Sequence, residues 1–288
     1  MKPLTKVIDY NAVGSRPQPL EDFFLQCPDN VAVVTDIMAI ECLKRDSLAN
    51  YRQSFKILSR YSERVIVLKP FTSLRNRPPQ KDRFYHEIVD REFTCSFPEY
   101  CTAILNTTDP TSLTAIERAR SGVFSMTQRL TELANTDLRS MIRDSEKIIS
   151  PAQLCEWRSG KPISLPELAF AHRNIAATMT ALFSMFFPDR PRPSVTDGPY
   201  WLVYPYAVAL QALTLWWIRK GGYMGVSAPK LRNDSIDIFY AAYGTLFQGV
   251  ITSDTKLLEI TDLSNAIIRY SRSLNLNQPY SVRKNDMS

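Results

Sequence analysis

The stretch Asn233–Ile260 decides the fold that we expect, and it reads NDSIDIFYAAYGTLFQGVITSDTKLLEI. Asn233 or Asp234 is a suitable helix N-cap, because a short side-chain oxygen accepts hydrogen bonds from the free amides of the first turn. A glycine then ends the helix, Val250–Thr252 follows as a short strand, and Asp254 lies just beyond it. Apolar residues at helical spacing predict one buried face on the helix: Ile236, Phe239, Tyr240, Tyr243 and Phe247.

Three carboxylates in this stretch indicate a cation site. Asp234 and Asp237 are three residues apart, so we expect them on one face of the first helical turn. Asp254 follows a strand, and ligands of open α/β sheets bind outside the carboxyl ends of the strands. Mg²⁺ needs only one or two carboxylates, with water and substrate phosphates as its other ligands. The alternative is that the acids of the first turn only cap the helix and favour its positive end.

A second aspartate at a strand end lies near the N-terminus. Val31–Thr35 is a compact apolar, β-branched run that ends in Asp36, and a helix-like stretch follows at 37–58. Continuous apolar runs of this kind are typical of buried parallel strands.

In this order, the pieces resemble the PIN-domain nucleases: Val31–Asp36, the Asp-x-x-x-Ala-Ala segment at 237–242, and the Thr-x-Asp end of Val250–Asp254. The resemblance covers roughly the first 70 residues and about 225–270. It implies a three-layer α/β/α sandwich around a short parallel central sheet. It also implies an acidic cluster that binds Mg²⁺ or Mn²⁺ and metal-dependent cleavage of phosphodiester bonds, usually in RNA.

The resemblance assigns roles to individual acids. Asp36, Asp237 and Asp254 would hold the metal ion, and Glu41 and Asp234 would help directly or through water. One departure concerns the glutamate that the family usually places at the start of a helix after the second strand. The second strand expected here is 64–68, and no glutamate occurs between Pro70 and Arg83. Glu41 is our first candidate for that carboxylate, and Glu87 and Asp90 are later ones.

Basic residues near the ends of these motifs are candidates for contacts with the RNA backbone: Arg75, Arg77, Lys81, Lys230 and Arg232. The first three belong to a basic loop, for which a solvated surface is the alternative interpretation. The chain carries a net charge of +6 and has a pI near 9.0, which is compatible with a polyanionic partner.

The 288-residue chain divides into three parts in our prediction. A discontinuous PIN-like α/β core comprises 1–82 and 225–275, a mostly helical insertion at 83–224 packs on it, and 276–288 form a flexible tail. Within the core, residues 1–30 are expected to be an irregular lead-in with a short helix at Leu20–Leu25. Within the insertion, 166–187 is predicted to be one long helix.

Residues 198–218 are uncharged and carry aromatic residues near both ends. Their length would suffice to cross a bilayer. We favour a buried central helix, because Pro205 and Gln211 weaken a membrane span and a large α/β domain needs such a helix. A membrane-associated protein is the alternative.

The five cysteines predict neither a zinc site nor a disulfide scaffold. No Cys-x-x-Cys pair occurs, and the chain has only two histidines. A reducing, cytoplasmic location fits best, and the N-terminus lacks the pattern of a secretory signal.

The leading hypothesis is therefore a metal-dependent endoribonuclease with Mg²⁺ or Mn²⁺ as cofactor and RNA as substrate. The alternative of the interaction class is a catalytically inactive PIN-like scaffold. The resemblance also allows the role of a toxin, and in that role a protein inhibitor or antitoxin would be a partner. An oligomer is compatible with the sequence.

Overall fold

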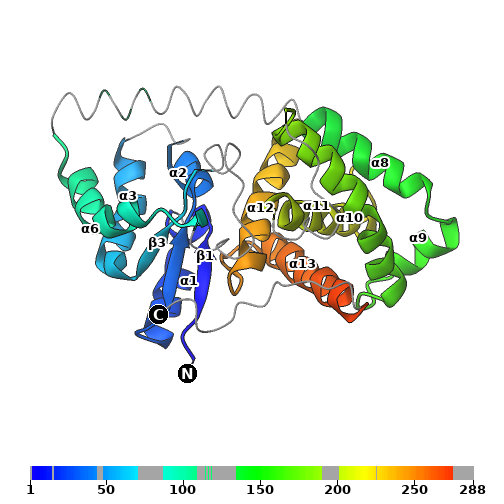
Figure 1. Cartoon of the computed structure of the whole chain (residues 1–288), viewed down its shortest axis with the longest axis horizontal. Coiled ribbons are helices and arrows are strands. Elements are labelled where there is room, and N and C mark those ends of the chain that lie inside the picture. Colours follow the sequence, from blue (N-terminus) through cyan, green and yellow to red (C-terminus); the bar gives the residue numbers. More distant parts are fainter. Residues whose placement is uncertain are drawn as a thin grey trace.

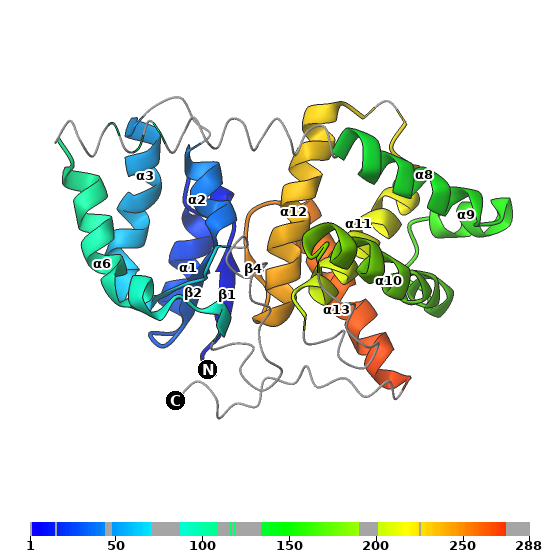
Figure 2. The same ribbon diagram turned by 45° about the horizontal axis from the view of Figure 1, so that its top comes forward.

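The protein is mixed α/β and mostly helical. The computed structural model describes residues 2–14, 16–43, 48–70, 87–108, 114, 116, 118, 134–189, 201–224 and 226–274. Figure 1 shows a small sheet with its helices at one end of the molecule and a bundle of helices at the other. Helix α12 (Ala228–Leu246) lies between the two, as the turned view in Figure 2 also shows. The α/β class predicted from the sequence is confirmed.

The sheet contains four short parallel strands in the order β3-β2-β1-β4. Their bounds are β1 Thr5–Ile8, β2 Val31–Val34, β3 Val65–Val67 and β4 Val250–Ile251. Val7 of β1 is in register with Val33 on one side and with Val250 on the other. The carboxyl ends of all four strands therefore meet at one edge of the sheet.

The prediction that residues 1–30 form an irregular lead-in is wrong, because β1 is an interior strand. Val7 and Ile8 are completely buried, and β1 pairs with both β2 and β4. Pairing on both sides satisfies the backbone groups of so short a strand, which local sequence does not reveal. The short helix expected at Leu20–Leu25 is confirmed and extended as α1 (Gln18–Gln26).

The helices near the sheet follow the predicted pattern. The helix-like stretch 37–58 forms α2 (Asp36–Leu43) and α3 (Leu48–Leu58), followed by the 3₁₀ turn η2 (Ser59–Arg64). Helix α6 (Arg91–Asn106) contacts β3 and α3, so this part of the expected insertion packs on the sheet side of the molecule.

The bundle contains the long helices predicted within 83–224. Its elements are η4 (Ala134–Leu138), α8 (Arg139–Lys147), α9 (Pro151–Trp157), α10 (Leu165–Phe186), α11 (Val203–Arg219) and α13 (Thr255–Ser273). Helix α11 packs against α10, α12 and α13 and is buried along most of its length, so the buried central helix is confirmed. Among the described residues, no helix has both the length and the apolar composition that crossing a membrane requires.

Helix α12 starts earlier than predicted. Its N-cap is Ser227, which has an extended backbone, and Pro229 occupies the first turn, where its missing N–H costs nothing. Asp234 and Asp237 therefore lie in the second and third turns, and the expectation that they belong to the first turn is wrong. After the helix, Gly249 takes φ +113°, a left-handed conformation that favours glycine, and the chain then enters β4.

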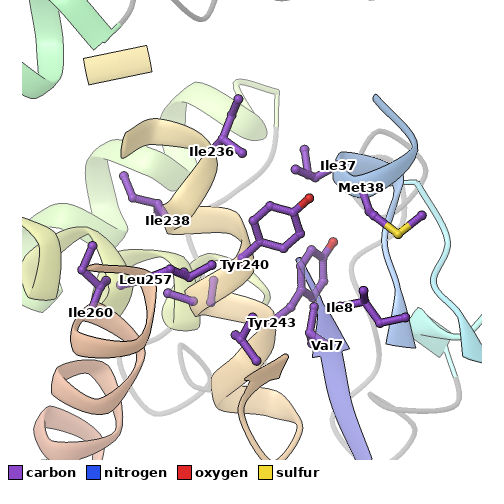
Figure 3. Packing of buried hydrophobic residues seen from close by; sticks show 14 of the residues in the cluster. Val7, Ile8, Ile37, Met38, Ile236, Ile238, Tyr240, Tyr243, Leu257 and Ile260 are labelled. Atoms are coloured by element: carbon purple, nitrogen blue, oxygen red, sulfur yellow. The ribbon is translucent and has the colours of Figure 1, made fainter. Parts of the chain in front are cut away.

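One face of α12 packs on the sheet and the other on α13. Figure 3 shows Tyr240 and Tyr243 pointing from α12 toward Ile37 of α2, with Val7 and Ile8 of β1 nearby. Leu257 and Ile260 of α13 pack on the opposite side. Burial of side chains of this size contributes about 1.5–3 kcal/mol each, so this packing fixes α12 against the carboxyl edge of the sheet. The division into a core and an insertion stays a prediction, and the tail at 276–288 lies outside the described residues.

Candidate functional site

Asp9 follows β1 at the carboxyl edge of the sheet. Asp9 is only 3% exposed to solvent. The Asp9 amide donates to the carbonyl of Ile251 at 3.0 Å, and Thr252 Oγ1 donates to Asp9 Oδ2 at 2.6 Å. From β1 the chain proceeds outward through β2 and then β3, whereas β4, the last strand in the sequence, lies on the opposite side of β1. Asp9 and Thr252 therefore bridge the topological switch point, where open α/β sheets usually bind ligands.

Glu41 of α2 lies near Asp9. Tyr240 Oη of α12 donates to Glu41 Oε2 at 2.7 Å. Burial raises the pKa of Asp9 to about 6, the hydrogen bond from Thr252 lowers it, and the negative charge of Glu41 raises it. The two carboxylates are thus close enough to repel each other, and a cation would relieve that repulsion.

Asp234 is completely buried, and both of its carboxylate oxygens have partners. Trp217 Nε1 donates to Oδ2 at 2.8 Å, and the Lys256 ammonium donates to Oδ1. A buried carboxylate is strongly destabilising unless it is paired in this way. Trp217 and Lys256 therefore fix Asp234 in position.

Asp237 shares the same ammonium. Lys256 Nζ lies 2.6 Å from Asp237 Oδ2. Burial raises the pKa of Asp237 to about 7, Lys256 lowers it, and the charges of Asp234 and Asp254 raise it. Burial lowers the pKa of Lys256, but Asp237 and Asp234 outweigh this effect and raise it above 10.5. Lys256 is therefore charged at neutral pH.

Asp254 caps helix α13. Its Oδ1 accepts hydrogen bonds from the amides of Lys256 at 2.8 Å and Leu257 at 3.2 Å. The Asp254 amide donates to Thr252 Oγ1 at 2.9 Å. The Thr252 hydroxyl thus connects Asp254 with Asp9. Capping engages one oxygen of Asp254, and its charge also acts on Asp237.

Asp36 lies at the start of α2, and its Oδ1 accepts from the amide of Ile37 at 3.0 Å. Burial raises the pKa of the Tyr206 and Tyr243 hydroxyls, and the charge of Asp36 raises both further. Among the described residues, no three His, Cys, Asp or Glu side chains form a group that could hold one metal ion. The predicted combination of Asp36 with Asp237 and Asp254 therefore does not form such a group in the described part of the chain.

The predicted RNA-binding residues fall into two groups. Lys230 lies over the ring of Trp217, 5.4 Å from its centroid, and Arg232 donates to the side chain of Asn233. Both belong to the first turns of α12, before Asp234. Arg75, Arg77 and Lys81 lie outside the described residues. Of the later carboxylate candidates, Asp90 caps α6 by accepting from the amide of Phe93 at 3.0 Å.

Sequence reasoning missed several residues of this edge, above all Asp9, Lys256 and Thr252. The signal for Asp9 was present, because it follows two apolar residues just as Asp36 follows its strand. Thr252 belongs to the Thr-x-Asp motif, but the motif alone does not indicate that the Thr252 hydroxyl contacts Asp9. No local signal pointed to Lys256, because its partners belong to the preceding helix.

Comparison of the chain with protein-family models, with curated proteins and with solved structures finds no match.

Proposed function

We propose that this chain is a PIN-like ribonuclease that uses Mg²⁺ or Mn²⁺ at the carboxyl edge of its sheet. The observation that carries the proposal is the position of Asp9 and Glu41. Because Val31–Val34 is the second strand, Glu41 lies in the helix after the second strand, where PIN-domain nucleases usually have a glutamate. Asp9 then takes the place of Asp36 as the aspartate that ends the first strand. The three-layer sandwich belongs to the same proposal.

The donor chemistry suits one divalent cation between Asp9 and Glu41. Both side chains offer carboxylate oxygens, which Mg²⁺ prefers, and two carboxylates are enough when water and phosphate complete its shell. Asp9 has no ion pair with any described residue, and burial together with Glu41 raises its pKa to about 6. A cation would favour the ionised form of Asp9 and remove its repulsion with Glu41.

The residues of the edge would then act in distinct ways. Asp9 and Glu41 would hold the cation, and the hydrogen bonds from Thr252 and Tyr240 orient these two carboxylates. The bound ion supplies polarisation of a phosphoryl oxygen and a lowered pKa for water. Asp237, with a pKa of about 7, is suited to take up or release a proton at neutral pH.

The RNA backbone would approach over the start of α12. Lys230 and Arg232 are the described cations before Asp234, and Arg75, Arg77 and Lys81 remain proposed contacts. Phosphate contacts by such residues position a nucleic acid without reading its sequence. A toxin role with a protein inhibitor or antitoxin as partner, a cytoplasmic location and an oligomeric state remain parts of the proposal.

The test is cleavage of a labelled single-stranded RNA by the full chain with Mn²⁺, with Mg²⁺ and with EDTA. We expect cleavage with either metal ion and none with EDTA. Asp9→Asn should lower the rate by about 100-fold or more, because one of two metal-holding carboxylates is lost. Asp36→Asn is the matched control and should retain most of the activity. Equal loss in both variants, or cleavage that EDTA does not inhibit, would contradict the assignment.

A catalytically inactive interaction protein is the second candidate, and Lys256 is the observation that favours it. Its ammonium already neutralises Asp234 and Asp237, two acids that the nuclease hypothesis assigned to the site. This candidate predicts a folded chain whose melting temperature does not respond to Mn²⁺ and which does not cleave RNA.

A further inference from the structure

The ammonium of Lys256 lies between two carboxylates of the acidic edge. It contacts Asp234 Oδ1 and lies 2.6 Å from Asp237 Oδ2. The side chain of Lys256 is 17% exposed, that of Asp237 is 14% exposed, and that of Asp234 is not exposed at all. A completely buried carboxylate and a largely buried one are therefore bridged by one positive charge that the chain itself supplies.

The surrounding residues hold this charge in place. Lys256 lies in the first turn of α13, and its amide is bound by the capping carboxylate of Asp254. Trp217 fixes the far oxygen of Asp234, and Lys256 Nζ lies 6.0 Å from the ring centroid of Trp216. The backbone and the side chain of Lys256 are thus both held by contacts, so the ammonium has a defined position at the edge.

The bridged pair is connected to the Asp9–Glu41 pair by two routes. Asp237 precedes Tyr240 by three residues on α12, and Tyr240 donates to Glu41. The charge of Asp254 acts on Asp237, and the Asp254 amide donates to Thr252 Oγ1, which in turn donates to Asp9. The edge thus has two connected acidic positions, of which one contains an ammonium.

We propose that Lys256 is a tethered cation that fills the second cation position of this edge and limits the edge to one divalent ion. The inference rests on the proposed function only for the ion at Asp9 and Glu41. An ammonium neutralises carboxylates and donates hydrogen bonds, but it cannot bind and activate water as a metal ion does. Lys256 would therefore determine how many ions bind.

The experiment is a Mn²⁺ titration of the full chain, in which electron paramagnetic resonance measures the free ion and hence the number bound. Unchanged protein is compared with Lys256→Met, which removes the charge but keeps a flexible unbranched chain. Lys256→Arg keeps the charge and is the conservative control. The double variant Lys256→Met with Asp234→Asn removes one carboxylate as well, so it keeps the edge foldable if the single variant does not fold.

We expect one ion in the unchanged chain and in Lys256→Arg, and two in Lys256→Met. The second ion should bind Lys256→Met at least about tenfold more tightly than any second ion binds the unchanged chain, because a positive charge in contact with the site is gone. Mn²⁺ should also raise the melting temperature of Lys256→Met more than that of the unchanged chain. The double variant should melt higher than Lys256→Met in EDTA, and it should still bind a second ion more tightly than the unchanged chain does, because Asp237 remains without the ammonium.

The outcomes separate this inference from the proposed function. If the unchanged chain binds one ion and cleaves RNA, but Lys256→Met gains neither an ion nor a larger Mn²⁺-dependent rise in melting temperature, the inference alone is overturned. If Lys256→Met does not fold, the double variant decides, and a second ion that binds it no more tightly than it binds the unchanged chain also overturns the inference. If Lys256→Met gains an ion while the unchanged chain neither binds Mn²⁺ nor cleaves RNA, the inference stands and the proposed function fails.

Discussion

The two halves of the acidic edge differ in how they balance negative charge. At Asp234 and Asp237 the positive charge comes from the Lys256 side chain. Lys256 contacts both carboxylates, and Trp217 donates a hydrogen bond to Asp234. At Asp9 and Glu41 the hydroxyls of Thr252 and Tyr240 donate to the two carboxylates, and Asp9 has a raised pKa. Removing a charge should therefore have opposite effects in the two halves.

The largest expected effect is the loss of Lys256. Lys256→Met leaves Asp234 and Asp237 buried without their positive partner, and breaking a buried ion pair in this way costs about 3–5 kcal/mol. Denaturant unfolding in EDTA at pH 8 measures the change. Lys256→Arg should lose much less. A loss below about 1 kcal/mol in Lys256→Met would mean that the pair contributes no more than a surface ion pair does.

In metal-free protein, Asp9→Asn should raise the free energy of unfolding rather than lower it. The native pKa of Asp9 is about 6, above the ordinary value of 3.8 for an aspartate, so the native state binds the proton more tightly than the unfolded state does. Stability should therefore fall as the pH rises through this window, by about 3 kcal/mol from Asp9, and the loss should persist above pH 6. Asp9→Asn removes this loss, because an amide does not ionise.

The measurement for Asp9 is the unfolding free energy at pH 5 and at pH 8 in EDTA. The difference between these two values should be smaller in Asp9→Asn than in the unchanged chain, and Asp36→Asn should keep the original difference. Mg²⁺ should reduce the difference in the unchanged chain, since it binds the ionised form. A steeper pH dependence in Asp9→Asn would show that the carboxylate is favoured by its surroundings.

How far the sequence predicted this edge depends on how local each signal is. Apolar runs in the sequence predict three of the observed elements: strand β2, helix α11 and the strand before Asp254. Strand β1 has only two apolar residues, and its interior position depends on pairing with β2 and with a strand more than 240 residues later in the chain. Lys256 approaches Asp234 only because α13 packs on α12, which no periodicity encodes.

The two neighbouring tryptophans allow a smaller and well-matched comparison. Trp217 Nε1 donates to the buried Asp234, whereas Trp216 Nε1 donates to Glu259, whose side chain is 44% exposed. Trp217→Phe should cost about 1–3 kcal/mol beyond any loss of packing, because a buried carboxylate oxygen loses its donor. Trp216→Phe should cost less, since water replaces the lost donor at Glu259. Thermal unfolding of both variants measures the difference, and equal losses would show that ring packing dominates.

The smallest effect concerns two tyrosine hydroxyls on successive turns of α12. Tyr240 Oη donates to Glu41, whereas Tyr243 Oη is buried without a hydrogen-bond partner among the described residues. Tyr240→Phe should therefore lower stability by about 1 kcal/mol, and Tyr243→Phe should leave it unchanged or raise it, because an unsatisfied buried hydroxyl is removed. Both changes keep the ring and its packing, so denaturant unfolding compares the hydroxyls alone. Tyr240→Phe should also weaken Mn²⁺ binding, since Glu41 loses the donor that orients it. If Tyr243→Phe weakened Mn²⁺ binding as much as Tyr240→Phe, the cation position would lie nearer to Asp36 than to Glu41.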